Sequence, residues 1–312
     1  MTPGRPILLD TDIGTDVDDI VALSLALSSP ELDLVGVTTV YGDVDLRARM
    51  VTRMLQLAGR EEVPVACGAR QPLLGRPPVY WAGHEGEGLL EPGQELPPPV
   101  RDHAADLIVR TALERPGQVT LVAVGPLTNV ALAFAREPQL AGALAGLVVM
   151  GGVARLAREA LGWPLAEHNV RCDPEAARVV FGAGARLTMV GLDVTLRATI
   201  TRAEVERIKK AGTPFHRALA DQLERYLAVR RRDFTYMHDP LALALTIDPT
   251  LVRSERALVQ VETGGELAAG MTLVSRPADG RANADVALEV DAPRFMALLV
   301  ERLVRGPKGA AA

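Results

Sequence analysis

The feature that most constrains the fold of this chain is a regular alternation of short apolar segments with amphipathic ones. Apolar segments rich in β-branched residues predict buried strands at 7–10, 32–40, 64–66, 119–124, 144–150 and 187–190. Apolar residues at helical spacing predict helices between them at 18–28, 43–58, 101–114, 127–135 and 174–181. Strands separated in this way pair in parallel through right-handed crossovers. We therefore expect an α/β fold with an open, mostly parallel twisted sheet, flanked by helices around a Rossmann-like core.

The rest of the chain adds a helical region, three strands and one long loop. Residues 201–245 have a largely helical pattern. Further strands, before a last helix, are expected at 257–261, 271–274 and 285–290. The segment 68–99 is rich in Pro and Gly and predicts a long loop of the kind that often forms the rim of an active site. Because neither a repeat nor a linker interrupts the pattern, we expect residues 1–312 to form a single domain.

The composition limits the kinds of partner that the chain can have. Its 312 residues carry a net charge of −5 without a basic excess, so we expect no nucleic-acid partner and no anionic membrane partner. No apolar run reaches the roughly 18 residues that cross a bilayer, and the segment before residue 7 is too short and broken for a secretory signal. Two cysteines, Cys67 and Cys172, cannot form a disulfide framework. We therefore expect a cytoplasmic protein that acts on a small molecule.

Several residues that we single out as site candidates lie where the predicted strands end. Asp10 and Asp12 follow the first strand, Asp43 follows the second, and Val124 and Met150 end two later strands. In open parallel sheets, ligands bind beyond the carboxyl ends of the strands. We therefore expect these positions to converge on one site.

The strongest local signal is the segment DTDIGTDVDD at 10–19, which carries five carboxylates within ten residues. These charges repel one another strongly unless a cation offsets them, and a hard divalent cation with oxygen ligands is the natural partner. Gly14 allows a tight turn that brings the acids on its two sides face to face. Helix capping explains one or two of the acids, but Asp10 and Asp12 lie on the strand side of the turn. The segment also lacks the Glu that completes an EF-hand loop.

A phosphatase of the haloacid-dehalogenase type also begins with Asp-x-Asp after a strand. That type usually has Thr or Val two residues after the second Asp, where this chain has Gly14, and it needs a downstream Lys. Lys209 and Lys210 lie on a helix that we expect to be exposed. A Mg²⁺-dependent phosphohydrolase that uses the Asp-rich loop is therefore an alternative function.

Together with the rest of the chain, the acidic segment resembles the inosine–uridine-preferring nucleoside hydrolase family. The resemblance extends from Ile7 to about Asp248, through five blocks in the family's order. The blocks are DTDIGTDVDD at 10–19, HEGEGL at 84–89, VGPLTN at 124–129, MGG at 150–152 with EHN at 167–169, and HDP at 238–240. The presence of NVRCDPEAA at 169–177 beside them makes a chance agreement implausible.

The resemblance implies an open α/β fold with a Ca²⁺ ion at the bottom of the pocket. The implied ligands are the backbone carbonyl of Val124 and the side chains of Asp12, Asp19 and Asp239. Asp18 is expected to bind the ribose 2′-hydroxyl close to the ion. Asp16 is a further candidate near the ion, in a loop that is longer than the shortest family form.

The implied reaction is hydrolysis of the N-glycosidic bond of a ribonucleoside to free base and ribose. Carboxylates stabilise the oxocarbenium-like ribosyl cation, and Ca²⁺ has enough coordination sites for protein oxygens, ribose hydroxyls and the attacking water. Asp12 is the expected general base, and His238 is the expected acid on the side of the leaving base. The implied substrate-binding residues are Asp18, Asp43, His84, Met150, Glu167, His168, Asn169 and Tyr226.

Within that set, the resemblance gives each group a place. Glu167 and Asn169 are expected to bind ribose hydroxyls, and Met150 is expected to pack on the sugar. Tyr226 is expected to line the base pocket, and His84 to close over the nucleoside from the rim loop. Structural roles compete with these assignments, because Glu167 and Asn169 can cap the helix near Pro174 and Met150 can belong to the core. Two further features have structural interpretations, a solvated helix face at 230–232 and cysteines without an evident histidine partner.

Three positions depart from the family pattern. The family often has Asn where this chain has Asp43, a second Asn where it has Leu161, and Phe where it has His168. Because of these departures, a nucleoside with a modified sugar, or another N-riboside, is also an open candidate for the substrate. The departures also keep open a second alternative, a non-catalytic Ca²⁺-dependent riboside-binding protein. By resemblance we expect a homodimer or a homotetramer.

Overall fold

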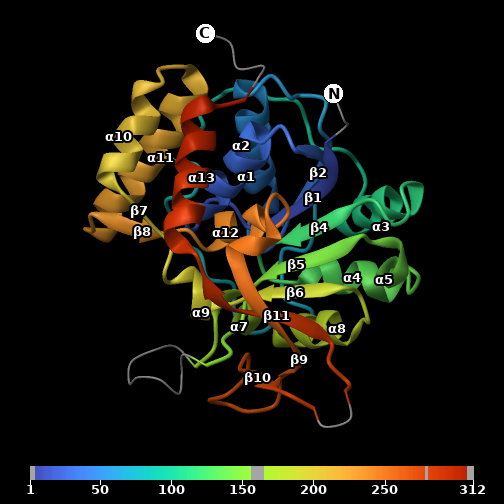
Figure 1. The fold of residues 1–312 in the computed structure, drawn as a ribbon. Helices are drawn as coiled ribbons and strands as arrows, with labels where there is room; N and C mark the ends of the chain where they lie inside the picture. Colours follow the sequence, from blue (N-terminus) through green and yellow to red (C-terminus); the bar gives the residue numbers. More distant parts are fainter. Residues whose placement is uncertain (1–3, 156–164, 278–279, 308–312) are drawn as a thin grey trace.

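A computed structural model describes residues 4–155, 165–277 and 280–307 (Figure 1). The strands of the main sheet are β1 (Arg5–Thr11), β2 (Leu32–Thr39), β3 (Val65–Cys67), β4 (Thr120–Ala123), β5 (Gly146–Met150), β6 (Leu187–Val190), β9 (Val252–Val261), β10 (Thr272–Ser275) and β11 (Ala284–Val290). Over the described residues, these nine strands are ordered β10-β9-β11-β6-β5-β4-β1-β2-β3. The expected α/β fold with a mostly parallel sheet is confirmed.

The strand order determines where a ligand can bind. β1 has β2 and β3 on one side and β4, β5, β6 and β11 on the other, and all of these strands are parallel. β9 and β10, at one edge, run antiparallel to their neighbours. The chain therefore adds β2 and β3 on one side of β1 and then returns to add β4, β5 and β6 on the other, so the strand order reverses between β1 and β4. Such a switch point leaves a crevice beyond the carboxyl ends of the strands.

Both faces of the sheet are covered by helices, and the side chains of β1 show why. Ile7 and Leu9 are buried in one hydrophobic core and Leu8 in the other, because successive side chains of a strand point to opposite faces. The helices of the first core are α1 (Asp18–Ser28), α2 (Val44–Leu57), α9 (Leu192–Thr195), α10 (Arg202–Lys210), α11 (Pro214–Arg230), α12 (His238–Ala244) and α13 (Ala292–Arg305). The helices of the second core are α3 (Ala104–Glu114), α4 (Thr128–Arg136), α5 (Leu140–Ala143), α7 (His168–Cys172) and α8 (Pro174–Gly182). A 3₁₀ turn, η1 (Pro249–Leu251), precedes β9.

The largely helical region expected at 201–245 is confirmed by α10, α11 and α12, but it also contains a short strand that the pattern did not predict. The strand is β8 (Phe234–Tyr236), which pairs antiparallel with β7 (Thr199–Thr201) in a separate two-stranded sheet. A strand of three residues is too short to show an alternating pattern, and its partner lies outside the segment. The pairing that creates it is therefore not visible in the local sequence.

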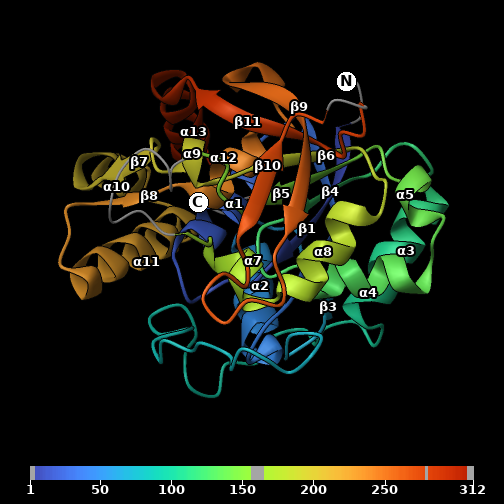
Figure 2. The same ribbon diagram turned by 90° about the horizontal axis from the view of Figure 1, so that it is seen from below.

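The expected loop at 68–99 is confirmed, because its residues form neither helix nor strand. Figure 2 shows this segment looping out beside α2. Arg49 of α2 donates a hydrogen bond to the carbonyl of Gln94, with an N–O distance of 3.2 Å. The loop is therefore attached to the helix that follows β2.

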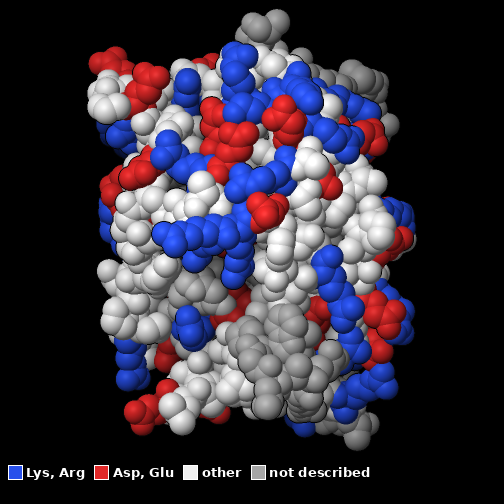
Figure 3. Space-filling model, turned by 90° about the vertical axis from the view of Figure 1, so that its left-hand side faces the viewer, with Lys and Arg blue, Asp and Glu red and all other residues white. Residues whose placement is uncertain are grey.

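The face that carries α10 and α11 has basic and acidic side chains interspersed (Figure 3). Lys209 illustrates the arrangement, with its ammonium 2.8 Å from a carboxylate oxygen of Glu224 and 3.2 Å from one of Asp221. Exposed pairs of this kind contribute little to stability. In the described part of the chain, no helix is long and apolar enough to cross a membrane.

Candidate active site

A cavity of about 370 Å³ lies at the switch point, beyond the carboxyl ends of β1, β4 and β5. Its walls combine carboxylates, two arginines, two histidines and several apolar groups. They are Asp12, Thr15, Asp16, Asp18, Asp19, Tyr80, Val124, Met150, Ala166, Glu167, His168, Asn169, Arg171, Leu192, Arg230, His238 and Asp239. All of the expected site residues are among them except Asp43, His84 and Tyr226.

The acidic segment reaches the cavity through a turn between β1 and α1. Gly14 has φ +119°, and a Cβ at this position would lie 2.9 Å from Sδ of Met50. Only glycine adopts such a backbone conformation without strain. The turn brings Asp12, at the end of β1, to the same cavity as Asp18 and Asp19 in the first turn of α1. The glycine expected to allow a tight turn therefore has that role.

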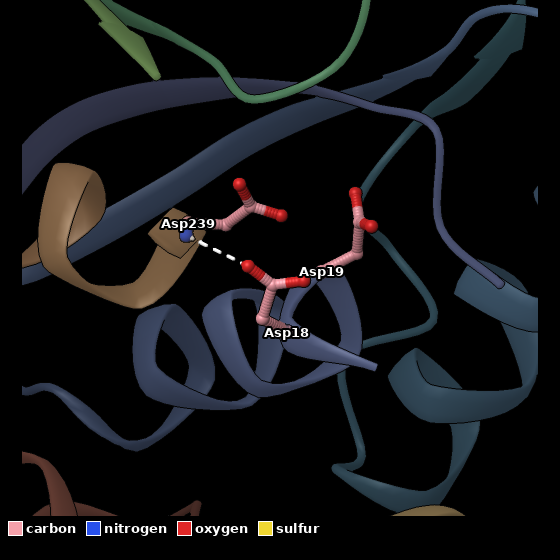
Figure 4. A group of neighbouring side chains, drawn as sticks. All are labelled: Asp18, Asp19 and Asp239. Carbon is pink, nitrogen blue, oxygen red and sulfur yellow. Dashed lines mark hydrogen bonds between the residues drawn. The ribbon is translucent and has the colours of Figure 1, made fainter. Parts of the chain in front are cut away.

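Three carboxylates meet at the bottom of the cavity. Asp18 and Asp19 from α1 and Asp239 from the start of α12 each offer an oxygen, and these atoms lie within 4.8 Å of one another. Figure 4 shows the three side chains directed toward a common space between the two helix starts. The amide of Asp239 donates to Asp18 Oδ2 at 3.1 Å, and the hydroxyl of Thr11 donates to Asp19 Oδ1 at 2.5 Å.

Burial makes this cluster electrostatically demanding. All three side chains are at least 96% buried, and burial raises the pKa of Asp18, Asp19 and Asp239 well above the ordinary value. Repulsion among the neighbouring carboxylates raises each pKa further. Burial also raises the pKa of Asp12. Together these acids can be ionised only at a high free-energy cost, and a cation in the common space would remove that cost.

The donor set fits a hard metal ion. The backbone of Val124 lies in the cavity wall beside the acids, and its carbonyl accepts a hydrogen bond of 2.7 Å from the side-chain amide of Asn169. A carbonyl oxygen has two lone pairs, so this bond leaves one for a metal. Carboxylate and carbonyl oxygens are the ligands of Mg²⁺ and Ca²⁺ and not of soft metals. The residues present therefore fit a metal of the Mg²⁺ or Ca²⁺ class.

Asp10 does not belong to this cluster. It is fully buried behind the cavity, where its Oδ1 accepts hydrogen bonds from the Thr38 hydroxyl at 2.5 Å and the Asn129 amide at 2.8 Å. Burial raises the pKa of Asp10 to about 7. The first acid of the segment therefore ties β1 to β2 and α4.

Glu167 and Asn169 both line the cavity from the start of α7. The Glu167 carboxylate accepts hydrogen bonds from three backbone amides, those of Asn169, Val170 and Gly152, at 2.7, 3.1 and 3.1 Å. Glu167 therefore caps α7, whereas α8 near Pro174 is capped by Asp173. The capping role that competes with sugar binding is thus real for Glu167, although it applies to a different helix.

Asn169 holds the ends of two strands together. Its side-chain Nδ2 contacts the carbonyl oxygens of Val124 at 2.7 Å and Met150 at 3.2 Å, and also lies 3.5 Å from Sδ of Met150. Met150 is 3% exposed and lines the cavity while also packing in the first core. The core role and the cavity role are therefore both present at this residue.

His168 stands where the family often has Phe, so this part of the cavity wall is polar. Its ring packs edge-on against Tyr41 and Tyr80, with centroid distances of 6.5 and 6.1 Å. Nε2 of His168 lies 3.5 Å from Sγ of Cys172, so the view that this cysteine lacks a histidine partner was wrong. The sequence separation of four residues becomes a contact because both lie on α7. Burial raises the pKa of the Cys172 thiol to about 12, which leaves it protonated.

His238 lies at the start of α12, next to Asp239 of the acidic cluster. Its Nδ1 is 2.7 Å from the hydroxyl of Thr195, and its ring lies 5.5 Å from that of Tyr236. Burial lowers the pKa of His238, against an opposing effect of the Asp16 charge. The imidazole is therefore neutral at neutral pH in the free protein.

Asp16 connects the acidic segment with α11. Its Oδ2 accepts a hydrogen bond of 2.7 Å from the hydroxyl of Tyr226, and Nε of Arg230 donates to the same hydroxyl at 3.1 Å. The Arg230 guanidinium also lies 5.2 Å from the centre of the Tyr226 ring. Arg230 is exposed, as expected for a solvated helix face at 230–232, and it also lines the cavity. Tyr226 itself lies behind Asp16.

The structure does not bring Asp43 and His84 to the cavity. Asp43 caps α2 through a 3.1 Å hydrogen bond from the amide of Leu46 and lies 3.6 Å from Arg70. His84 borders a separate small space next to Tyr226 and Asp16. Leu161, where the family often has Asn, lies outside the described residues.

Sequence reasoning missed Arg47, which is fully buried behind the acidic segment. It also missed Tyr80, Arg171 and Leu192, which line the cavity. A charged residue on the apolar side of the helix expected at 43–58 was the one available signal for Arg47. The others lie on loops and short helices, where no periodic pattern marks the inner face.

Known proteins share both the sequence and the fold. The family model described as inosine-uridine preferring nucleoside hydrolase matches residues 7–297. The pyrimidine-specific ribonucleoside hydrolases RihA of Photobacterium profundum and Salmonella arizonae are each 39% identical to this chain, over 96% of it and 98% of each relative. Among solved structures, the plant nucleoside hydrolase PpNRh1 is 32% identical, with a TM-score of 0.84 over 97% of this chain and 99% of that one.

A second solved structure has a different stated preference. The purine-preferring ribonucleoside hydrolase from Gardnerella vaginalis is 30% identical, with a TM-score of 0.82 over 96% of this chain and 98% of that one. The matched range of the family model contains every residue that lines the cavity. This chain is a member of the inosine-uridine preferring nucleoside hydrolase family, an enzyme that hydrolyses the N-glycosidic bond of ribonucleosides.

Proposed function

We propose that the enzyme works with a Ca²⁺ ion held by the Val124 carbonyl and by Asp12, Asp19 and Asp239, with Asp18 and Asp16 close by. The observation that carries this proposal is the buried group of Asp18, Asp19 and Asp239, whose oxygens lie within 4.8 Å of one another. Ca²⁺ accepts more ligands than Mg²⁺ and in more flexible geometry, so it leaves room for substrate oxygens beside the protein ligands. The wide cavity over the acids favours an ion of that kind.

When bound, the ion supplies positive charge that offsets the carboxylates and lowers the pKa of a water molecule. Asp12 accepts the proton of the attacking water. It is the acid at the end of β1, 6% exposed, and therefore reachable from the cavity while shielded from bulk solvent. The surrounding carboxylates stabilise the oxocarbenium-like ribosyl cation as the N-glycosidic bond breaks.

His238 donates a proton to the leaving base. The hydroxyl of Thr195 lies 2.7 Å from Nδ1 and holds the ring, which leaves Nε2 as the nitrogen that delivers the proton. Because the imidazole is neutral in the free protein, it takes up a proton from solvent before it acts as the acid, and the negative charge of Asp16 favours that uptake. The role of His238 is greatest for bases that are poor leaving groups.

Ribose is bound between the acids and the α7 wall. Asp18, Glu167 and Asn169 bind its hydroxyls, and Met150 packs on its apolar face. His168 borders the base, Tyr226 acts on this side of the pocket through its hydrogen bond to Asp16, and His84 approaches from the rim loop when the nucleoside binds. The hydrogen bonds that Glu167 already accepts hold its carboxylate in a single orientation.

The test is release of free sugar from inosine, uridine, cytidine, adenosine and guanosine. The panel includes both base classes because the RihA relatives are named pyrimidine-specific and a solved relative is named purine-preferring. Each assay is run with metal-free protein and is then titrated separately with Ca²⁺ and Mg²⁺. We expect activity to return with Ca²⁺ at lower concentration than with Mg²⁺.

The Asp12→Ala variant should lose Ca²⁺ binding and turnover together. Asp221→Ala is the matched control, because Asp221 is an exposed acid on α11 that pairs with Lys209. Activity that is unchanged after complete metal removal, or an Asp12→Ala variant with full activity, would contradict the calcium assignment. Nucleoside binding without turnover would instead favour the riboside-binding alternative. Phosphate release from a phosphomonoester panel would favour the phosphohydrolase. That alternative needs a lysine in the site, whereas Lys209 forms ion pairs with Asp221 and Glu224 on the surface.

We also propose a cytoplasmic enzyme of nucleoside salvage that assembles as a homodimer or homotetramer. Both thiols are free, which suits a reducing compartment. Light scattering after size-exclusion chromatography measures the assembly, and a monomeric mass at assay concentration would contradict it.

A further inference from the structure

Arg47 of α2 is a buried cation whose role in the site is not apparent from the acids themselves. Its side chain is fully buried, yet within the described residues no carboxylate lies within ion-pair distance of it. An arginine removed from water is costly unless its N–H groups find other acceptors. Its hydrogen bonds therefore indicate what the residue holds in place.

The acceptors are backbone carbonyls of the turn that carries the acids. Nη1 donates to the carbonyl of Asp12 and, at 2.7 Å, to that of Ile13. Nη2 donates to the hydroxyl of Thr15 at 3.1 Å, and Nε donates to the carbonyl of Tyr41 at 2.7 Å. One guanidinium thus joins the turn between β1 and α1 to Tyr41, two residues beyond the end of β2.

The same side chain also contacts the rim loop. The Arg47 guanidinium lies 5.0 Å from the centre of the Trp81 ring, within the range of a cation–π interaction. A second connection runs beside it, because the Thr15 hydroxyl lies 3.1 Å from Oε1 of Glu85. Glu85 in turn accepts hydrogen bonds from the amides of Ala82 and Gly83, at 2.8 and 2.7 Å.

These contacts have a consequence for the cavity. The rim segment 80–85 supplies Tyr80 to the cavity wall, and the turn 12–16 supplies Asp12, Thr15 and Asp16. The two segments are joined through Arg47 and through the Thr15–Glu85 pair. We propose that Arg47 is a positioning residue that locks the acidic turn and the rim segment 80–85 into one unit, so that Asp12 and the cavity wall are preformed together.

The first test does not involve a metal. Hydrogen exchange of the metal-free protein is compared for the parent, Arg47→Met and Arg49→Gln. Methionine keeps much of the apolar volume of arginine but has no donor. Arg49 is the matched control, because it is an exposed arginine on the same helix whose hydrogen bond goes to Gln94. We expect amides of 12–17 and of 80–90 to exchange faster in Arg47→Met only.

The second test rests on the proposed function, because it measures Ca²⁺ binding by calorimetry together with kcat and KM. Loss of a group that orients metal ligands typically costs about 10–100-fold in metal affinity or activity, so we expect a loss in that range for Arg47→Met. Arg47→Lys, which keeps the charge but not the planar fork, should recover only part of it. Trp81→Leu releases the rim without touching the turn, so KM should rise while Ca²⁺ affinity stays at the parental value.

The outcomes separate the two proposals. If the parent itself neither binds Ca²⁺ nor needs it, the calcium assignment fails, while the exchange experiment still decides the role of Arg47. If Arg47→Met is folded and both segments exchange as in the parent, Arg47 does not lock them and the inference is wrong. If Arg47→Met does not fold, Arg47→Lys and Trp81→Leu provide the same comparison, and parental exchange at 80–90 in both overturns it.

Discussion

The backbone amide of Asp239 donates a hydrogen bond to the carboxylate of Asp18, with 3.1 Å between the nitrogen and Oδ2, although the two residues are 221 positions apart. The bond joins the first turn of α12 to the first turn of α1, two helices that pack against each other in the same core. It brings the carboxylates of Asp18, Asp19 and Asp239 to one point. The geometry of the acidic cluster is therefore a product of helix packing.

The stabilising effect of the metal should grow as the pH rises. Burial and mutual repulsion raise the pKa of Asp18, Asp19 and Asp239 in the metal-free fold, so between the unfolded and the folded values the native state binds more protons than the unfolded state. Stability of the metal-free protein therefore falls as the pH rises through that window, whereas a bound cation replaces the protons. The shift of Tm on adding Ca²⁺ should be larger at about pH 8 than at about pH 5. Equal shifts measured by calorimetry at both pH values would contradict a cation site at these acids.

Replacement of His238 should affect turnover according to the leaving group. His238→Ala removes the imidazole held by Thr195, and with it the proton donor to the base. We expect a fall in kcat of about 10²- to 10⁴-fold for nucleosides, the usual contribution of a general acid, and a much smaller fall for a riboside with a weakly basic leaving group such as nitrophenolate. Thr195→Val, which keeps the imidazole but not its partner, should have an intermediate effect. An equal loss on both kinds of substrate would remove the acid role and leave His238 a structural one.

Glu167 should affect stability as well as catalysis. In Glu167→Gln an amide group replaces one of the two oxygens that accept hydrogen bonds from the amides of Gly152, Asn169 and Val170. Leaving a buried donor without an acceptor costs about 1–3 kcal/mol in the free energy of unfolding. Urea denaturation should show this loss together with a reduced kcat.

Thr213→Ala is the comparison for Glu167, because Thr213 caps α11 through the amide of His216 and does not line the cavity. It should lose about 0.5–2 kcal/mol in the free energy of unfolding, while kcat stays at the parental value. A Glu167→Gln variant as stable as the parent would show that the three amide hydrogen bonds contribute nothing.

Asp43→Asn should leave catalysis nearly unchanged. The carboxylate of Asp43 caps α2 and faces Arg70 outside the cavity, and Asn is as good a helix cap as Asp. We therefore expect kcat/KM for a ribonucleoside to stay within about twofold of the parent. This change is smaller than the one that the loss of a single hydrogen bond to the substrate would cause. A large increase in kcat/KM would show that the residue approaches the ribose when substrate binds and that Asp at this position limits activity.

The parallel strands of the central sheet and the helices that connect them could be predicted because the hydrophobic pattern that marks each of them is local. Residues 7–9 are apolar because β1 is buried on both faces, and α1 begins after the turn that carries Asp12 and Asp16. β8 could not be predicted in the same way, because three residues become a strand only through pairing with β7. The same reasoning applies to Cys172 and His168, whose contact follows from a short helix that the sequence pattern does not mark.

The class of the fold, the acidic turn after β1 and the blocks near β4, β5 and the start of α12 can be read from the residues alone. These are local properties, because hydrophobic periodicity sets each element and the order of the elements sets a parallel sheet. Which polar groups share one space depends on how the elements pack: packing joins Asp239 to Asp18, leaves Asp43 outside the cavity, and places Arg47 beneath the acidic turn. The physical reason is that burial and hydrogen-bond partners depend on how distant segments pack, and these two quantities give a carboxylate or a guanidinium its chemical role.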